Sequence, residues 1–349
     1  MIAKQSPAQD VSLSSNHKFP YRWNIKDGYP AKGIEYHGST VMTTFACGGG
    51  SSMGYKLAGF NVVAANDIDP QMAKVYKANH NPKQFFLCGI EELLKRDDLP
   101  KVDVLDGSPP CSVFSMAGSR EGAWQKDKMF REGQAKQILD DLFFDFIKLA
   151  EKVQPKVIIA ENVKGMLAGH AKWYTREVVR KLNEIGYTTQ VYLLNANTMG
   201  VPQRRQRVFF IANKTSKKIK LSFKEPFIPF KLIDNGLGKP LSETYLDMWD
   251  KTKPGFSFSE AHPKGSFFNT IKVHPNRVMP TITASSGGRM THYKAPNEIT
   301  NESIALSGSF PIDYNYMDIK PKYLIGMSVP PIMMAQVAHQ VYEQLLKVI

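Results

Sequence analysis

Short apolar runs recur along the chain from residue 41 onwards, and amphipathic stretches separate several of them. The runs occupy residues 41–46, 61–65, 102–105, 157–160, 191–194 and 208–212, and each is short enough to be a buried strand. Apolar residues return at helical spacing from Ile138 to Val153, and again from Val178 to Ile185. Strands that alternate with helices predict an α/β protein with a doubly wound, mostly parallel sheet.

This alternation is missing at both ends of the chain. Residues 1–40 are polar and carry three prolines with no sustained period, so we interpret them as an N-terminal extension. Beyond residue 212 the chain becomes rich in Pro, Gly, Lys and Phe, and a last amphipathic helix follows Pro330 and Pro331. We therefore predict one domain over 41–212, a small inserted domain over 213–300, and a return to the first domain over 301–349.

The charge of the chain is strongly basic and unevenly distributed. The 349 residues carry a formal net charge of +13, and residues 203–275 hold fourteen Lys or Arg but only six acids. Aromatic residues are interleaved with this charge, as in a small folded unit with one basic face. Such a segment is either a solvated surface over an aromatic core or a surface that binds a polyanion such as nucleic acid.

Three cysteines are too few for a disulfide scaffold. Cys47, Cys88 and Cys111 are far apart and lack paired Cys/His spacing, so we expect no structural zinc site, and we expect a reducing compartment. No apolar run reaches the length of about 18 residues that a membrane helix needs, and the N-terminus lacks the apolar core of a signal peptide. These observations predict a soluble intracellular protein without a membrane partner.

A glycine-rich turn directly follows the first predicted strand. Residues 45–54 read FACGGGSSMG, and Asp67 ends the next strand. Glycines let the backbone approach a ligand closely, and an acid after the second strand can accept hydrogen bonds from ribose hydroxyls. The pattern fits a dinucleotide or S-adenosylmethionine equally well, and a purely structural turn is the alternative.

Two further strand ends carry reactive side chains. The segment DVLDGSPPCSVFS, at 103–115, delivers Cys111 after two rigid prolines, and the strand VIIA is followed by Glu161. Open α/β sheets bind ligands at the carboxyl edge, so a thiol and a carboxyl there predict a nucleophile with a general acid. The alternatives are an inert buried cysteine and a solvated or helix-capping glutamate.

The segment QRRQR at 203–207 precedes the last strand of the first domain. Side chains two residues apart on an extended segment point the same way, so Arg205 and Arg207 are predicted to converge on one anion or polar edge, with Arg204 opposite. The alternative is that these basic residues only precede a strand and have no binding role.

Together, these motifs resemble the DNA (cytosine-5) methyltransferase family of prokaryotes and phages. FACGGGSSMG is similar to its cofactor motif, PPCSVFS to its catalytic loop, ENV to its Glu motif and QRRQR to its Gln-x-Arg-x-Arg motif. RVMPTIT at 277–283 and IGMSVPP at 325–331 extend the resemblance towards the C-terminus. The resemblance implies the class I S-adenosylmethionine-dependent methyltransferase fold, with catalysis and cofactor binding in 41–212 and target recognition in 213–300.

The resemblance also implies a mechanism. Cys111 would add to C6 of a cytosine flipped out of double-stranded DNA, Glu161 would act at N3, and Arg205 and Arg207 would hold the base and its surroundings. The loop 116–134 would close over the base. The methyl group would pass from S-adenosylmethionine to C5 within a short specific sequence.

The implied binding residues fall into two sets. Ile68 would lie against the adenine and Asp67 on the ribose, and the implied cofactor-binding residues are Phe45, Ala46, Gly48, Gly50, Asp67, Ile68, Gly89, Ile90, Leu142 and Ser328. The implied DNA-binding residues are Ser115, Gln203, Arg205 and Arg277. No metal is implied.

Several positions depart from the family pattern. Cys47 stands in place of a glycine, Thr43 in place of a common Asp, Gly89 in place of an Asp that accepts the adenine amino group, and Met327 in place of an Asn. We expect the missing acceptor at Gly89 to weaken cofactor binding by the ~1 kcal/mol of one hydrogen bond.

Three alternatives remain. A branch of the family methylates RNA, but it carries Cys-Phe-Thr after the Glu motif where this chain has KGML at 164–167, which favours DNA. A non-catalytic DNA-binding relative would be expected to lose Cys111 or Glu161. A nicotinamide oxidoreductase would leave the Pro-Cys, ENV and QRRQR segments unexplained. We expect a cytoplasmic, nucleoid-associated monomer, with a separately acting restriction endonuclease as a partner left open.

Overall fold

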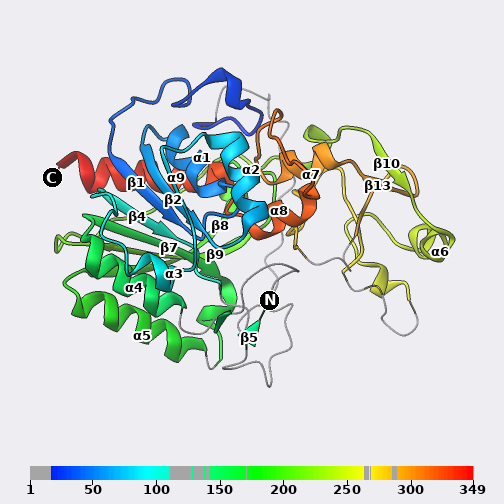
Figure 1. The fold of residues 1–349 in the computed structure, drawn as a ribbon. Helices are drawn as coiled ribbons and strands as arrows, with labels where there is room; N and C mark the ends of the chain where they lie inside the picture. The colour runs from blue at the N-terminus through cyan, green and yellow to red at the C-terminus, as the bar shows by residue number, and fades with distance from the viewer. Residues whose placement is uncertain are drawn as a thin grey trace. The chain divides into compact units, whose positions relative to one another are not determined.

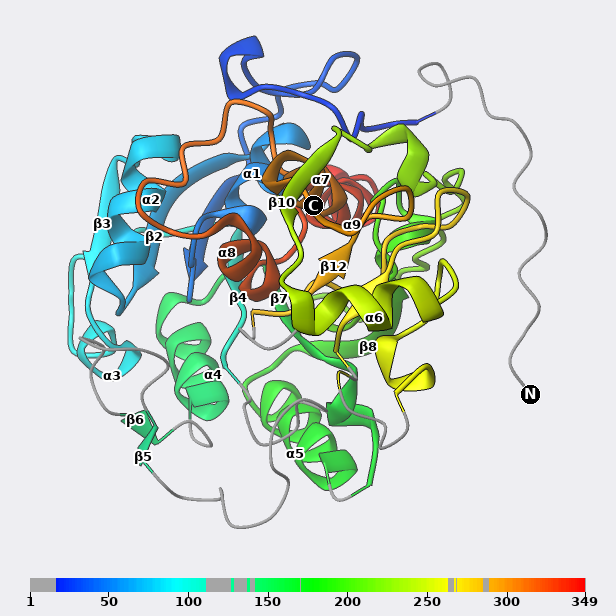
Figure 2. The same cartoon turned by 90° about the vertical axis from the view of Figure 1, so that its right-hand side faces the viewer.

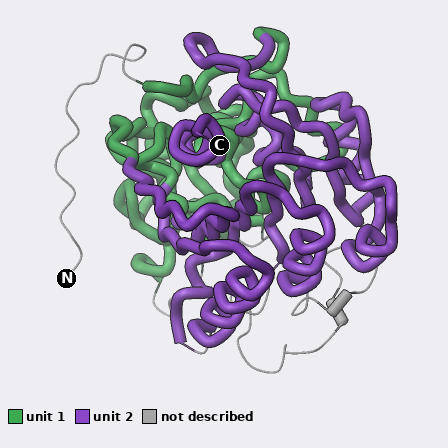
Figure 3. Tube along the Cα trace, turned by 90° about the vertical axis from the view of Figure 1, so that its left-hand side faces the viewer, with its two compact units in different colours: residues 1–27, 196–205, 223–333 green, residues 28–195, 206–222, 334–349 purple. Residues whose placement is uncertain are grey.

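The computed structural model describes residues 17–110, 127–128, 137–138, 142–169, 171–262, 267, 269–284 and 289–348. By its internal contacts the chain divides into two compact units (Figure 3). Unit 1 comprises residues 1–27, 196–205 and 223–333, and unit 2 comprises residues 28–195, 206–222 and 334–349. Both units are therefore built from separated stretches of sequence. The expected functional boundaries at residues 40, 212 and 300 stay a prediction.

Unit 2 is built on a seven-stranded sheet with the order β3-β2-β1-β4-β7-β9-β8 (Figure 1). Its strands are β1 (Thr40–Thr44), β2 (Asn61–Asp67), β3 (Gln84–Leu87), β4 (Val104–Gly107), β7 (Val157–Val163), β8 (Thr188–Asn195) and β9 (Gln206–Asn213). Strand β9 runs antiparallel to both of its neighbours, whereas the pairs from β3 across to β7 are parallel. The prediction of a doubly wound, mostly parallel sheet is confirmed.

Helices cover both faces of this sheet (Figure 1). The helices of unit 2 are α1 (Gly50–Leu57), α2 (Pro70–His80), α3 (Ile90–Leu93), α4 (Leu142–Val153) and α5 (Ala171–Glu184). A turn of 3-10 helix, η3 (Lys164–Leu167), follows β7. Buried residues of α3, α4 and α5 join one apolar core with Met42, Leu105 and Ile158 of the sheet. The C-terminal helix α9 (Pro331–Gln344) belongs to unit 2 from Met334 onwards.

Local chemistry explains where several helices begin. The carboxylate of Asp69 accepts hydrogen bonds from the backbone N–H groups of Gln71 and Met72, and Pro70 occupies the first helical position of α2. Helix α4 buries Leu142, Phe146 and Leu149, which recur at helical spacing. Periodicity and capping thus act together in positioning the helices.

The predicted elements differ from the observed ones in three places. Ile138 lies in a short antiparallel pair, β5 (Asp127–Lys128) with β6 (Gln137–Ile138), so the helix predicted from Ile138 is wrong at its start, and α4 begins at Leu142. Strand β3 was missed because its apolar run is only three residues long. Helix α2 was missed because polar residues interrupt its apolar pattern.

Unit 1 contains a small sheet with the order β10-β13-β12-β11 (Figure 2). Its elements are β10 (Leu237–Pro240), β11 (Ile271–Lys272), β12 (Met290–Thr291), β13 (Asn297–Ile299), α6 (Glu243–Lys251), α7 (Asn301–Ser307) and α8 (Pro321–Met327). Single 3-10 turns occupy Ile25–Asp27, Ala196–Thr198, Phe230–Leu232 and Phe258–Glu260. Leu241, Met248 and Phe258 form an apolar cluster beside α6.

The N-terminal segment 17–27 is an integral part of unit 1. Phe19 and Trp23 are buried, and Trp23 Nε1 donates a hydrogen bond to the carbonyl of Ser309. The carboxylate of Asp313 accepts hydrogen bonds from the backbone N–H groups of Ile25 and Lys26. These contacts fix a segment whose sequence shows no regular period. Within the part of the chain that the structure describes, no helix is both long and apolar enough to span a membrane.

Candidate active site

The carboxyl ends of five parallel strands lie along one edge of the unit 2 sheet. Strands β1, β2, β3, β4 and β7 run in the same direction, so the residues that follow them emerge at that edge. The glycine turn follows β1, Asp67 ends β2, and Gly89 comes shortly after β3. Pro109 and Pro110 follow β4, and Glu161 lies near the end of β7. The topology therefore gathers the predicted residues of unit 2 at one edge.

The glycine turn has a strained backbone. Phe45 and Cys47 have φ angles of 52° and 48°, and Gly49 has a φ of 84°. A Cβ atom at Gly49 would lie 2.0 Å from Nε2 of His80, which is buried at the end of α2. Only glycine fits there, because both the backbone angle and the imidazole exclude a side chain. Gly48 and Gly50, which the sequence singled out, flank this position.

Asp67 joins the glycine turn to the end of β2. Its Oδ2 accepts a hydrogen bond of 2.7 Å from the backbone N–H of Cys47, and its Oδ1 accepts one of 2.9 Å from that of Asp69. Burial raises the pKa of Asp67 to about 6, although the backbone hydrogen bonds oppose that shift. The carboxylate has lone pairs beyond these two bonds, and it is suited to accept hydrogen bonds from ribose hydroxyls.

The segment after β3 completes this part of the edge. Asn66 Nδ2 donates hydrogen bonds to the carbonyl oxygens of Phe86 and Cys88, which holds the segment against β2. A Cβ atom at Gly89 would lie 3.5 Å from Cδ1 of Ile68, so these two predicted residues are neighbours. Ile90 is buried and begins α3.

The residues of unit 2 fit a nucleoside cofactor with an amino acid tail. The buried carboxylate of Asp67 is followed in the sequence by the apolar side chain of Ile68, and the turn presents backbone without side chains at Gly48, Gly49 and Gly50. Ala46 is buried, its N–H donates to the carbonyl of Asn66, and Phe45 packs against the main core. Leu142 is buried in the same core at the first residue of α4. Ser328 belongs to unit 1, where it ends α8 and donates its hydroxyl to the carbonyl of Leu324.

Glu161 is paired with a buried arginine. Arg207 Nε lies 2.8 Å from Glu161 Oε1, and only 13% and 9% of the two side chains is exposed. The next residue, Asn162, donates its Nδ2 to the carbonyl of Pro109 at 3.0 Å, which ties the end of β7 to the segment after β4. Cys111, Ser115 and, apart from Asp127–Lys128, the loop 116–134 lie outside the described residues.

Arg205 and Gln203 are structural anchors within unit 1. Arg205 donates hydrogen bonds to the carbonyl oxygens of Ile282, Gly326 and Ser328, and its side chain is fully buried. Gln203 accepts from the N–H of Ile282 and donates to the carbonyl of Ser307. The expectation that Arg205 and Arg207 converge on one anion is wrong in this conformation, because Arg205 hydrogen bonds to main-chain carbonyls whereas Arg207 pairs with Glu161. Gln203 was expected to contact DNA, and its side-chain amide instead forms these hydrogen bonds within unit 1.

Arg277, the other expected DNA contact of unit 1, is exposed on a fixed backbone. Its carbonyl accepts a hydrogen bond from the N–H of Phe230, and its own N–H donates to the carbonyl of His274. Gly255 has a φ of 93°, and a Cβ atom there would lie 2.8 Å from the Arg277 guanidinium. The glycine thus makes room for this guanidinium.

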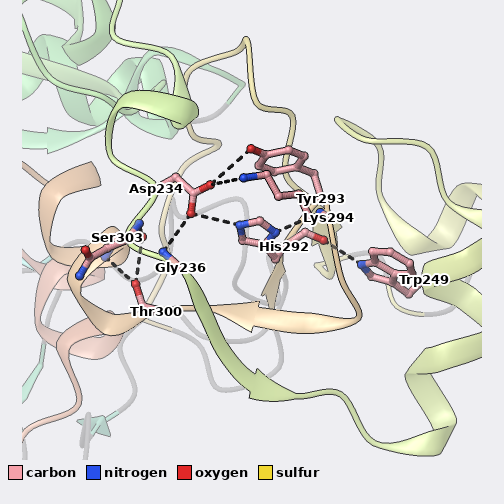
Figure 4. Close-up of polar contacts among 9 residues, drawn as sticks. Asp234, Gly236, Trp249, His292, Tyr293, Lys294, Thr300 and Ser303 are labelled. Carbon is pink, nitrogen blue, oxygen red and sulfur yellow. Dashed lines mark hydrogen bonds and ion pairs between the residues drawn. The ribbon is translucent and has the colours of Figure 1, made fainter. Parts of the chain in front are cut away.

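The carboxylate of Asp234 organises the part of unit 1 that surrounds the small sheet (Figure 4). Asp234 Oδ1 lies 3.1 Å from Nε2 of His292, and the Tyr293 hydroxyl and the Lys294 ammonium reach Oδ2. The N–H of Lys294 donates to Nδ1 of His292, so this nitrogen is an acceptor and Nε2 carries the proton that faces Asp234. The carbonyl of His292 in turn accepts from the indole N–H of Trp249 on α6. The cluster joins α6 to the β12–β13 hairpin.

The sequence did not reveal three of these groups. His80 and Asp106 are both buried in unit 2, but His80 ends a helix that was not predicted and Asp106 directly follows a predicted apolar run, and Asp234 is one acid in a basic stretch. Among the described residues, no three His, Cys, Asp or Glu side chains form a group that could hold a metal ion.

A sequence profile described as C-5 cytosine-specific DNA methylase matches residues 39–262. The chain is 30% identical over 275 residues to the Type II methyltransferase M.FnuDI of Fusobacterium nucleatum, covering 74% of each protein. It is 29% identical over 280 residues to the Type II methyltransferase M.NgoPII of Neisseria gonorrhoeae, covering 75% of this chain and 76% of that protein.

A solved structure shares the fold. It is described as a DNA modification methyltransferase encoded within a prophage of E. coli, with a TM-score of 0.66 and 20% identity. The superposition covers 88% of this chain and 99% of that one. The class I methyltransferase fold that the motifs implied is therefore confirmed.

Proposed function

The chain belongs to the C-5 cytosine-specific DNA methylase family and is a DNA (cytosine-5) methyltransferase; from that premise we propose that it methylates a flipped-out cytosine through a covalent bond to Cys111. The observation that carries this proposal is the edge at which Glu161, paired with Arg207, lies beside the anchored Pro109 segment. Cys111 follows Pro109 and Pro110 directly in the sequence. The Glu161 carboxyl group and the described segment that precedes Cys111 in the sequence thus belong to neighbouring strands.

Cytosine C5 is a weak nucleophile and needs activation. The Cys111 thiolate adds to C6, the electron pair of the C5–C6 double bond shifts towards N3, and Glu161, in its protonated form, donates its proton to N3. The ring is then a neutral enamine whose C5 is nucleophilic and attacks the methyl donor. Loss of the C5 proton, expulsion of the Cys111 thiolate and return of the N3 proton to Glu161 restore the aromatic ring. A base inside the duplex stack is inaccessible to these groups, so the cytosine must flip out, at a cost of a few kcal/mol in unstacking.

Arg207 and Asn162 position the reacting groups. The guanidinium of Arg207 engages Oε1 of Glu161 and leaves Oε2 as the atom proposed to face N3. Asn162 holds the carbonyl of Pro109, which limits where the following residues can lie. Arg205 acts indirectly, by holding the main chain at Ile282, Gly326 and Ser328.

S-adenosylmethionine supplies the methyl group as an activated sulfonium. Asp67 would bind the ribose hydroxyls and Ile68 would contact the adenine, with Gly89 and Ile90 beside them. The glycine turn at Gly48 to Gly50 would leave room for the amino acid tail. Phe45, Ala46, Leu142 and Ser328 complete the proposed set.

Unit 1 is proposed to hold the target sequence of double-stranded DNA. Residues 213–275 hold eleven Lys or Arg and six acids, and Arg277 is exposed beside them in the sequence. Arginine and lysine side chains there would contact phosphates, which gives affinity that depends on salt. The names of M.FnuDI and M.NgoPII support a role as the modification enzyme of a Type II restriction system, with a separate endonuclease.

The proposal is tested by bisulfite sequencing of a methylation-free bacterial host that expresses the chain. We expect cytosines in one short motif to be protected, and this protection to be lost in Cys111→Ala and Glu161→Gln. Bisulfite sequencing of transfer RNA from the same cells is the second arm. Protection in transfer RNA but not in DNA would overturn the DNA substrate, and protection that survives Cys111→Ala would overturn the covalent mechanism.

A further inference from the structure

Asp106 is a buried acid that the reaction described above does not use. It lies in β4, where it is opposite Thr43 of β1 and Ile159 of β7, and it is only 1% exposed. Side chains alternate between the two faces of a strand, so Asp106, Thr43, Ile159 and Glu161 lie on one face of the sheet. The apolar core of α4 and α5 packs on the opposite face, through residues such as Leu105 and Ile158.

Helix α1 covers Asp106 on this face. The Tyr55 hydroxyl donates a hydrogen bond of 3.1 Å to Asp106 Oδ1, and the Ser51 hydroxyl is also hydrogen bonded to this carboxyl group. Ser51 and Tyr55 are four residues apart, so they lie on the same side of α1. One carboxyl group therefore holds two successive turns of this helix.

Neighbouring contacts anchor the other side of the same helix. Thr43 Oγ1 lies 3.0 Å from Ser52 Oγ, and the Tyr76 hydroxyl donates to Ser52 Oγ at 2.8 Å. All residues of α1 except Lys56 are buried. A helix of only eight residues is thus fixed from β1, β4 and α2 by polar contacts inside the protein.

The two elements that Asp106 joins carry the two halves of the site. Helix α1 directly follows the glycine turn, so its position sets that of Gly48 to Gly50. Strand β4 directly precedes Pro109, whose carbonyl Asn162 holds. The bond between Tyr55 and Asp106 joins these two elements directly.

We propose that Asp106 is a positioning residue for the cofactor site, which holds the glycine turn in its binding conformation through Tyr55 and Ser51. The proposal rests on the function proposed above. Burial is the largest cause of a rise in the pKa of Asp106 to about 8, and the charge of Glu161 adds to it, while the bonds from Tyr55 and Ser51 oppose it. At neutral pH the carboxyl group is therefore mainly protonated, and an amide can replace it.

Four single variants and one double variant of the full chain test this inference. Asp106→Asn keeps an acceptor for Tyr55, Asp106→Leu removes the polar group, and Tyr55→Phe removes only the hydroxyl. Tyr187→Phe is the matched control, because the Tyr187 hydroxyl is also buried and donates to one partner, the carbonyl of Pro155. Calorimetry with S-adenosylhomocysteine gives the Kd, and steady-state kinetics give kcat and the KM for S-adenosylmethionine.

We expect Asp106→Leu to raise the Kd and the KM about tenfold, with kcat within about threefold of wild type, because the lost contacts order the turn before binding. Tyr55→Phe should raise both about three- to fivefold, and the double variant Asp106→Leu/Tyr55→Phe should be no worse than Asp106→Leu. Asp106→Asn and Tyr187→Phe should bind like wild type. This rescue by the amide and the split between KM and kcat distinguish positioning from general destabilisation.

Wild-type affinity in Tyr55→Phe and Asp106→Leu would overturn the inference, and so would an Asp106→Asn that binds as weakly as Asp106→Leu. If Asp106→Leu does not fold, the test is the comparison of the Kd of Tyr55→Phe with that of Tyr187→Phe, provided that the two variants have the same melting temperature. If the wild-type chain binds S-adenosylhomocysteine but methylates no DNA, the proposed function is refuted. The role of Asp106 is still tested in that case, because calorimetry compares the Kd values of the variants without any methylation.

Discussion

Arg207 and Glu161 form an ion pair across two antiparallel strands, with Nε and Oε1 2.8 Å apart. Arg207 lies opposite Val163 in the register of β9 with β7, and it reaches diagonally to Glu161. Both side chains are largely buried, so each charge depends on the other for compensation. The carboxyl group proposed to act at N3 is therefore held by a cation from a segment that is distant in sequence.

Removing the cation should destabilise the protein as well as inactivate it. In Arg207→Leu a buried carboxylate loses its partner, and we expect the free energy of unfolding to fall by about 3–5 kcal/mol. The double variant Glu161→Gln/Arg207→Leu buries no charge at this place and should regain much of that loss while remaining inactive. Urea denaturation of the two variants and wild type checks this. Equal stability of the single and double variants would contradict the ion-pair interpretation.

A methyl group at Gly49 should disrupt the cofactor turn. The added Cβ atom would collide with His80, and the φ of 84° disfavours any side chain. We expect Gly49→Ala to abolish binding of S-adenosylhomocysteine in calorimetry and to lower the melting temperature. Gly186→Ala is the control, since its φ is 91° and nothing lies within 4 Å of the added atom, so it should cost only about 1 kcal/mol of backbone strain. Similar losses in both variants would show that backbone strain alone is responsible.

Cofactor binding should weaken in acid because of Asp67. The carboxyl group accepts hydrogen bonds from ribose hydroxyls best when ionised, and its pKa is raised to about 6. The affinity for S-adenosylhomocysteine should therefore be constant above pH 7 and fall as the pH drops through 6. The free energy of unfolding depends on pH in the opposite direction. A carboxyl group whose pKa is raised by folding stabilises the folded state at low pH, and this contribution is lost as the pH rises through 6. Asp67→Asn should abolish the pH dependence of binding, and its persistence in that variant would assign it to another group.

An acid at Gly89 should strengthen cofactor binding. Gly89 has φ and ψ of −68° and 160°, which any residue adopts, and a Cβ atom there meets only Ile68, at ordinary contact distance. We expect Gly89→Asp to gain one hydrogen bond to the adenine amino group, worth about 1 kcal/mol or roughly fivefold in Kd. Gly89→Ala is the control and should leave the Kd unchanged. Unchanged or weaker binding by Gly89→Asp in calorimetry would exclude this role.

DNA binding should depend steeply on salt. With about four phosphate contacts, the affinity should fall roughly 100-fold between 50 and 200 mM salt. Fluorescence anisotropy with a labelled duplex gives the slope, and Arg277→Gln should reduce the slope by about one contact. A flat salt dependence would remove the phosphate contacts proposed for unit 1.

The strand pattern and the reactive motifs of unit 2 were predictable because each depends on local sequence. Apolar runs predicted six strands of its sheet, and the shared direction of β2 and β7 brings Asp67 and Glu161 to one edge. The ends of elements were less predictable, since Ile138 pairs as a strand although its spacing fits α4. Alternation along a chain does not indicate how long each element is.

Contacts between distant residues could not be predicted. Because side chains two residues apart on an extended strand point the same way, we predicted that Arg205 and Arg207 lie on one side. Strand β9 begins only at Gln206, so this alternation does not extend to Arg205. Arg205 consequently hydrogen bonds to carbonyl oxygens that lie 77 to 123 residues later in the chain. The bond between Asp106 and Tyr55 likewise depends on the register of β4 beside β1, which no local pattern contains.

The division of the chain also sets the order in which it can fold during synthesis. Unit 2 takes its last segment from residues 334–349, where Val337, Val341 and Leu345 are fully buried. Tyr342 from this segment stacks on His37, near the beginning of the unit. A ribosome that has finished the seven strands of the sheet has therefore not yet released the residues that complete its core. Unit 2 must wait until residues 334–349 have left the ribosome, and a nascent chain that lacks them presents an unfinished apolar face to chaperones.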